Sequence, residues 1–171
     1  MNNLQPLLQQ MIERWRSHGI AIPAGVDESA IADFETRYGV KMPNDMREYF
    51  VAVNGMGEYG TCDEEMFCFF PLQHVQSIAE WVPDRLHKFQ HSAEYFLFAD
   101  HSISLPSFAI RLDRQQNTVN PLASVFSDFG HLLVQNFYTS FSDFLSQYLN
   151  DPWKTASLLP EQVELTIKNA K

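Results

Sequence analysis

Apolar residues recur at helical spacing through the first third of the chain, which predicts three amphipathic helices. Their buried positions are Leu4, Leu8, Met11 and Trp15 in the first, Ile31, Phe34 and Tyr38 in the second, and Met46, Phe50 and Val53 in the third. The first helix should end near Gly19, and the second should run from Asp27 to Gly39. The third should begin at Pro43, whose fixed φ suits a first helical turn, and end at 54–55.

The pattern changes to short apolar and aromatic runs after residue 65. These runs predict strands at Met66–Phe70, Tyr95–Ala99, Ser107–Leu112, Ala123–Phe126 and His131–Val134. The polar segment Asp113–Asn120 suits a hairpin connection between two of these strands. The segment Leu72–Phe89 groups its apolar residues as a helix would, but Pro83 should break or kink it.

The last apolar stripe predicts a helix with the clearest periodicity in the chain. It consists of Phe141, Phe144, Leu145, Tyr148 and Leu149. Ser140 and Asp143 resemble a capping box before it, and Asp151-Pro152 should stop it. Helices, then strands, then a helix predict an α+β fold with a mostly antiparallel sheet. We expect one domain over residues 1–152 and a tail over 153–171, with a short helix from Pro160.

Charge narrows the range of partners. The chain carries 21 acidic and 12 basic side chains, a formal net charge of -9. Ten of the acids and three of the basic residues lie between Asp27 and Glu65. Because an acidic surface repels phosphates and anionic headgroups, nucleic acid and membrane surfaces are poor partners, and a basic protein suits this field better.

The chain start and the cysteines suggest a compartment. Residues 1–15 have no basic n-region and no continuous apolar run, so we predict no signal peptide and a cytoplasmic location. Cys62 and Cys68 are the only cysteines. In a reducing cytoplasm we expect both to be free thiols.

Specific residues resemble the SUKH superfamily. The segment Ile31–Gly55, IADFETRYGVKMPNDMREYFVAVNG, is similar to its N-terminal signature, a helix with an acidic residue followed by an "lPxdyrxfl…NG" segment. The matching positions are Pro43, Asp45, Arg47, Phe50, Asn54 and Gly55. MFCFFPLQHV, FLFADHSISLPSFAIRL and FYTSFSDFLSQYL resemble the family's first strand, central hairpin and closing helix. The ordered resemblance covers residues 28–152, although His101–Pro106 lacks the glycines of the family's acidic turn.

The resemblance implies a single SUKH-like α+β domain without a catalytic centre or cofactor. Many bacterial members are immunity proteins that neutralise a partner toxin, often a nuclease, of contact-dependent or polymorphic systems. The fungal members that name the family regulate cell-wall assembly. The resemblance therefore implies a non-enzymatic protein-binding module, either an immunity protein or a regulatory scaffold.

Three patterns that could carry enzyme or cofactor chemistry lack the context they need. Gly55, Gly57 and Gly60 spell G-x-G-x-x-G, but a helical segment precedes them and acidic residues follow, unlike a dinucleotide-binding turn. His87 and His91 could share a helix face, yet zinc would need further ligands, for instance His101 or Cys62. Neither cysteine lies in electropositive surroundings, and no G-x-S-x-G elbow occurs. We expect no catalytic, metal or cofactor site.

The acidic segment after the third helix is the candidate binding site. As a negative patch it would steer a basic toxin domain into contact, and neighbouring apolar side chains would anchor that partner. We predict partner contacts at Met56, Glu58, Tyr59, Asp63, Glu64 and Glu65. Phe67 is either a further anchor or a core residue. The alternative interpretation of the acids is that they only keep the protein soluble.

Overall fold

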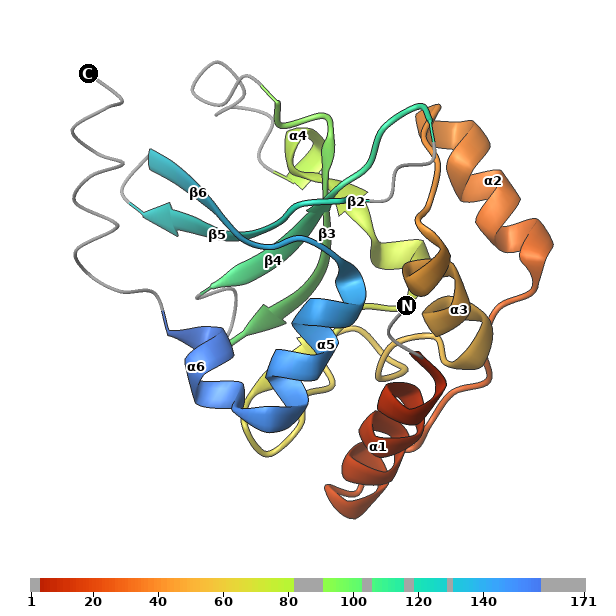
Figure 1. Ribbon diagram of the computed structural model, residues 1–171, viewed down its shortest axis with the longest axis vertical. Helices are drawn as coiled ribbons and strands as arrows, with labels where there is room; N and C mark the ends of the chain where they lie inside the picture. Colours follow the sequence, from red (N-terminus) through yellow and green to blue (C-terminus); the bar gives the residue numbers. More distant parts are fainter. Residues whose placement is uncertain (1–3, 82–90, 103–105, 116–118, 129–130, 158–171) are drawn as a thin grey trace.

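The computed structural model describes residues 4–81, 91–102, 106–115, 119–128 and 131–157 (Figure 1). The helices are α1 (Leu4–Ser17), α2 (Glu28–Tyr38), α3 (Asn44–Ala52), α4 (Ile78–Trp81), α5 (Phe141–Asn150) and α6 (Pro152–Ala156). The strands are β1 (Phe67–Phe69), β2 (Gln76–Ser77), β3 (Tyr95–His101), β4 (Ser107–Arg111), β5 (Leu122–Asp128) and β6 (His131–Tyr138). The predicted α+β class is confirmed. The helix expected from Pro160 lies outside the described residues.

The strands of the described residues form one antiparallel sheet in the order β1-β3-β4-β5-β6, with β2 also paired to β3. β3 to β6 form a meander, and the hairpin predicted between β4 and β5 is confirmed by their antiparallel pairing. β1 lies on the other side of β3, with Phe67 opposite His101 and Phe69 opposite Ala99. This pairing places the segment that leads into β1 at one edge of the sheet.

α5 packs across one face of the sheet through its predicted apolar stripe (Figure 1). The ring of Phe144 lies 5.1 Å from that of Phe98 and 5.0 Å from that of Phe108. Phe141 contacts Phe98 at 5.3 Å, and Tyr148 contacts Phe69 at 5.1 Å. Aromatic pairs at these separations add specific edge-to-face attraction to the burial of their surfaces. The helix is therefore fixed in register on the sheet.

Polar side chains define where the helices begin and end. The Asp27 carboxylate accepts the Ala30 amide at 3.0 Å, and the Ser140 hydroxyl accepts the Asp143 amide at 3.1 Å. Asp143 accepts the Thr139 hydroxyl at 2.7 Å, which ties it to the residue before the cap. Gly39 ends α2 in the left-handed conformation, with φ of 66°. The predicted starts at Asp27 and Ser140 and the stop at Gly39 are confirmed.

Two polar residues of the family-like signature tie distant segments together. Asp45 of α3 accepts the Ser142 amide at 2.9 Å, which caps α5 from 97 residues away in sequence. The Asn54 side chain accepts the Leu72 amide at 2.7 Å and so holds the chain after α3 against the chain after β1. Both contacts satisfy backbone donors that a helix start or a turn would otherwise leave open. Asp45 and Asn54, two polar residues of the signature, therefore make tertiary contacts.

A buried carboxylate joins α2 to the start of α3. Glu35 is 7% exposed and accepts the Met42 amide at 2.9 Å, the Lys41 ammonium at 2.8 Å and an Arg47 guanidinium nitrogen at 2.6 Å. Burial raises the pKa of this carboxyl, but the bonds from Lys41 and Met42 and the charge of Arg47 outweigh that effect and hold the pKa below its ordinary value. Glu35 is thus ionised, and its carboxylate links α2 to the start of α3.

The helix predicted over Leu72–Phe89 is wrong in its first half. Leu72–His74 form a 3₁₀ turn, Gln76–Ser77 pair with β3 as β2, and only Ile78–Trp81 are helical before residue 82. Pairing with β3 satisfies the backbone in an extended form, which overrides the helical spacing of the apolar residues. Pro83 lies outside the described residues.

Candidate functional site

The candidate site is the loop between α3 and β1. Its entry is fixed by Gly55, whose φ is 65° and which packs directly on the chain leaving β1. The Met56 amide donates to the Phe69 carbonyl at 3.0 Å, and the Met56 side chain is 2% exposed. Met56 therefore belongs to the core, and in this structure it offers a partner no surface.

Asp63 also lies inside the protein. It is 5% exposed, accepts the Phe67 amide at 2.8 Å and accepts the hydroxyl of Tyr148 from α5. That hydroxyl in turn accepts the indole N–H of Trp15 from α1 at 2.9 Å. Burial raises the pKa of the Asp63 carboxyl, and the bonds from Tyr148 and Phe67 oppose part of that rise. Asp63 thus ties the loop to α5, whose Tyr148 is bonded to α1.

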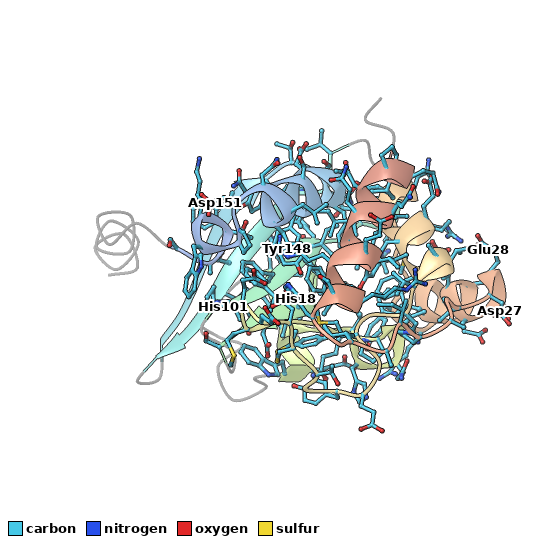
Figure 2. All side chains as sticks on the ribbon, turned by 90° about the horizontal axis from the view of Figure 1, so that it is seen from below. His18, Asp27, Glu28, His101, Tyr148 and Asp151 are labelled. Atoms are coloured by element: carbon cyan, nitrogen blue, oxygen red, sulfur yellow. A yellow bond between two sulfur atoms is a disulfide. The ribbon has the colours of Figure 1, made fainter. Side chains whose placement is uncertain are left out.

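Glu65 forms an ion pair with α1. Its carboxylate lies 2.6 Å from a guanidinium nitrogen of Arg14, and the two side chains are 24% and 20% exposed. Arg14 also donates to the Leu149 carbonyl at 3.2 Å and stacks over the Tyr148 ring at 5.1 Å. Figure 2 shows Tyr148 and His18 in the central region near α1 and α5. The charge of Glu65, one of the predicted contact residues, is therefore already neutralised by Arg14 of the same chain.

His18, Asp63 and Glu65 offer ligand atoms within 4.8 Å of one another, close enough together to share a metal ion. The chemistry around them favours an ion-pair network. Both Asp63 oxygens already accept hydrogen bonds, and the Arg14 guanidinium provides the positive charge beside Glu65. Of the histidines considered from the sequence, His91 pairs with Glu94 at 3.2 Å, and His87 lies outside the described residues.

Three predicted contact residues remain at the surface. Glu58 and Tyr59 are exposed, and the Glu64 side chain is 73% exposed. Among the described residues no lysine or arginine lies within ion-pair distance of Glu58 or Glu64. The Tyr59 ring contacts the Phe70 ring at 5.3 Å and the His74 ring at 4.9 Å, and the residue is still 58% exposed.

Tyr59 and Glu58 border a shallow surface hollow of about 500 Å³. Its other walls are Pro23, Asn54, Gly57, Pro71, Gln73 and His74. The hollow combines an aromatic ring, proline surfaces and a carboxylate, which suits an extended or cationic side chain of a protein partner. The surface formed by Glu58, Tyr59 and Glu64 is called the acidic loop surface below.

The prediction that Cys62 and Cys68 are free thiols is wrong. The structure joins them in a disulfide that brackets the turn carrying Glu64 and Glu65. Folding brings their Cα atoms to 4.2 Å, because the turn reverses the chain between them and the Asp63 amide donates to the Phe67 carbonyl at 2.9 Å. The chemistry of a compartment does not reveal which cysteines folding brings together, and that proximity decides whether a disulfide can form.

The G-x-G-x-x-G pattern has a backbone explanation. Gly55, Gly57 and Gly60 all have positive φ, of 65°, 89° and 92°. They lie in the irregular loop that follows α3 and precedes β1. A dinucleotide turn needs a strand before the glycines and a helix after them. Here a helix precedes the glycines and a strand follows them. Their positive φ angles therefore shape the loop between α3 and β1.

Replacing Tyr148 by phenylalanine is expected to lower the free energy of unfolding by about 2 kcal/mol, because it leaves two buried polar groups without their partner. Those groups are the Trp15 N–H and one Asp63 oxygen. Urea denaturation at neutral pH measures the change. Tyr59→Phe is the matched control, since its hydroxyl is on an exposed ring, and a loss under about 0.5 kcal/mol is expected there. Equal losses in both variants would contradict the network.

The fold and site together define a class: an α+β domain with an acidic, partly aromatic surface loop and structural polar networks. The chain belongs to the SMI1 / KNR4 family (SUKH-1), whose family model matches residues 25–147. This confirms the resemblance drawn from the signature. Domains of this family are generally non-catalytic immunity or regulatory domains that bind protein partners. Among curated proteins, no sequence matches this chain. None of the described helices has the length and apolar character to cross a bilayer.

The residues that hold the loop were not identified from the sequence. In the sequence, Trp15 and Tyr148 are recognisable only as members of apolar helical stripes. Arg14 and His18 belong to no motif that would indicate a role. A tyrosine or tryptophan within an apolar stripe does signal a buried hydrogen bond, because its polar atom needs a partner there. That signal indicates a polar contact without naming its partner.

Proposed function

We propose that this chain is an immunity protein that binds a partner toxin domain and neutralises it. The observation that carries the proposal is the acidic loop surface, which combines the exposed carboxylates of Glu58 and Glu64 with the exposed Tyr59 ring in one loop. Membership of a family of generally non-catalytic immunity or regulatory domains supports it. The alternative role, a regulatory scaffold of cell-wall assembly, has no such surface feature in its favour.

The charge of the surface favours a basic partner. Glu58 and Glu64 lie on a chain with a formal charge of -9, so the field outside the loop attracts cationic domains. A nuclease toxin is a basic partner of this kind, because its nucleic-acid-binding surface must attract phosphates. Binding at that surface would occlude the toxin's own substrate, and such neutralisation needs no catalytic group or cofactor on this chain.

The aromatic part of the surface supplies binding energy that charge alone does not. Tyr59 is 58% exposed, and its ring is held by Phe70 and His74. A tyrosine that is already held loses little conformational freedom on binding, which makes it an effective anchor. Tyr59 and Glu58 therefore act together, one as anchor and one as charge.

Co-expression tests the proposal directly. A toxin-like reading frame, sought beside this gene, is expressed with and without this chain, and growth and co-purification are measured. An immunity protein restores growth and elutes with the toxin in a fixed ratio. Failure to do either overturns the proposal. A regulatory scaffold predicts neither rescue nor a fixed-ratio complex.

Charge reversal at the acidic loop surface is expected to slow association with the toxin by about tenfold and to flatten its salt dependence. Glu58→Lys and Glu64→Lys are the test variants, and stopped-flow or surface-based kinetics at several salt concentrations is the measurement. Asp33→Lys on α2 is the control, because it makes the same charge change at an exposed site outside the loop. If Asp33→Lys slows association as much, only the net charge of the chain matters.

A further inference from the structure

His18 lies between α1 and the turn that carries Glu64, and it is none of the predicted contact residues. Its amide donates to the Arg14 carbonyl at 3.1 Å, which fixes its backbone on the last turn of α1. The side chain is 13% exposed and lies in the same central region as Tyr148 (Figure 2). The family model begins at residue 25, so family membership does not account for this histidine.

The His18 ring accepts a hydrogen bond from the loop. The Glu64 amide donates to its Nδ1 at 3.3 Å. A ring nitrogen that accepts an N–H carries no proton, so Nε2 holds the proton of this neutral ring. Nε2 lies 3.9 Å from a carboxylate oxygen of Glu64. The neutral ring therefore faces both the amide and the carboxylate of Glu64.

A second proton on the ring changes what Nδ1 can bind. Both nitrogens of an imidazolium are donors, so Nδ1 can no longer accept the Glu64 amide. An acceptor is already in place, because Oε2 of Glu65 lies 3.5 Å from Nδ1. This oxygen is buried and has no hydrogen-bond partner among the described residues. Since a buried carboxylate oxygen without a donor is costly, a proton on Nδ1 would satisfy it.

Charged and titratable groups from three elements lie around the ring. The loop carboxylates of Asp63, Glu64 and Glu65 favour an imidazolium, and the Arg14 guanidinium on α1 opposes it. From α5, the Tyr148 hydroxyl donates to Asp63. The carboxylates outnumber the guanidinium, so they can compensate a second positive charge beside them.

The change can stay within the turn, because other bonds hold the ends of the turn. The Met66 amide donates to the Asp63 carbonyl at 3.0 Å, and the disulfide between Cys62 and Cys68 brackets the same residues. None of these bonds involves the Glu64 amide. Protonation of the ring can therefore release the Glu64 peptide without opening the loop.

We propose that His18 is a pH-sensitive switch for the acidic loop surface. As a neutral ring it holds the Glu64 amide, and as a cation it releases that amide and donates to Glu65. Control of toxin binding by this switch rests on the proposed function. A cation at His18 weakens the negative field around Glu64, so association with a basic toxin should be slower in mild acid, where histidines gain a proton.

An NMR titration of the full-length chain from about pH 8 to pH 5, the range in which histidines change charge, tests the switch. The Glu64 amide proton should move upfield with the same midpoint as the His18 ring, because it loses its acceptor. His18→Asn should abolish this transition, since its side-chain oxygen can accept the amide and does not titrate. His91→Asn is the matched control. It removes a titrating histidine that pairs with Glu94, and the Glu64 transition should persist.

Two results of this titration would overturn the switch. One is a Glu64 amide that does not follow the His18 ring in the wild-type chain, and the other is a transition that persists in His18→Asn. The variant separates the ring from the carboxyls around it, which titrate in both chains. If His18→Asn does not fold, the comparison of the two midpoints in the wild-type chain decides the question.

The effect on binding is measured with the co-expressed toxin. The association rate of the wild-type chain relative to that of His18→Asn should fall several-fold between neutral pH and about pH 5.5, because only the wild-type chain gains the charge. A constant ratio overturns the control of binding while the immunity function stands. If no complex forms at any pH, the immunity function and the control of binding both fall, and the NMR titration still decides the local switch.

Discussion

Replacing Gly55 by alanine is expected to lower the free energy of unfolding by about 4 kcal/mol or more, the range of severe backbone and packing defects. A Cβ at this position would stand 2.6 Å from the Phe70 carbonyl carbon, 2.6 Å from the Pro71 nitrogen and 2.7 Å from the Phe69 oxygen. All three are backbone atoms, and they cannot withdraw without disturbing β1. The positive φ at Gly55 adds a further penalty for any side chain.

Gly60→Ala is the matched control for this prediction. Gly60 belongs to the same G-x-G-x-x-G pattern and has a φ of 92°, but a Cβ there would meet no atom within 4 Å. Its expected cost is therefore the backbone term alone, about 1–2 kcal/mol. Urea denaturation of both variants measures the difference in the free energy of unfolding. If Gly55→Ala fails to fold, a lower soluble yield than that of Gly60→Ala shows the defect. Equal stabilities would show that the close packing at Gly55 is wrong.

Glu35→Gln is expected to destabilise the protein by about 2 kcal/mol at neutral pH, somewhat less than the cost of breaking a fully buried ion pair, because Arg47 is partly exposed. The amide keeps the shape of the side chain but turns an N–H₂ group toward donors from Lys41, Met42 or Arg47. Glu28→Gln is the control, since Glu28 pairs with the same Arg47 yet is 64% exposed. A surface pair of that kind contributes about 0–1 kcal/mol.

The pH dependence of stability gives an independent measurement of Glu35. Its pKa is lower in the folded protein than the ordinary 4.5, so its contribution is complete above that value and disappears as the pH falls through the lowered pKa. Asp63 acts in the opposite direction. Its pKa is raised above 3.8, so the stability that it contributes is largest in acid and declines as the pH rises through the raised value. Glu35→Gln should therefore flatten the acid side of the stability curve.

Helix positions and the sheet class were predictable because they depend on local patterns. The stripe Phe141–Leu149, the cap at Ser140 and the stop at Gly39 each need only a few neighbouring residues to be read. The helix prediction for Leu72–Phe89 was wrong in its first half because the structure there depends on a distant strand. That half is shaped by pairing with β3, and no local pattern contains that information.

The exposure of the candidate contact residues was predictable only in part, for a similar reason. Glu58, Tyr59 and Glu64 are exposed as expected, whereas Met56 and Asp63 are buried and Glu65 pairs with Arg14. A run of acids in sequence does not show which carboxylate points inward, because that depends on partners from other elements. Whether the exposed three contact a toxin stays a prediction.

The bond between Trp15 and Tyr148 has a practical consequence for anyone shortening this protein. The family match spans residues 25–147, so a chain cut at those limits would lose both residues, and Arg14 and His18 with them. Asp63 would then lose the hydroxyl that now donates to it. The minimal unit that preserves the shape of the loop is therefore longer than the family boundaries, extending from α1 through the end of α5.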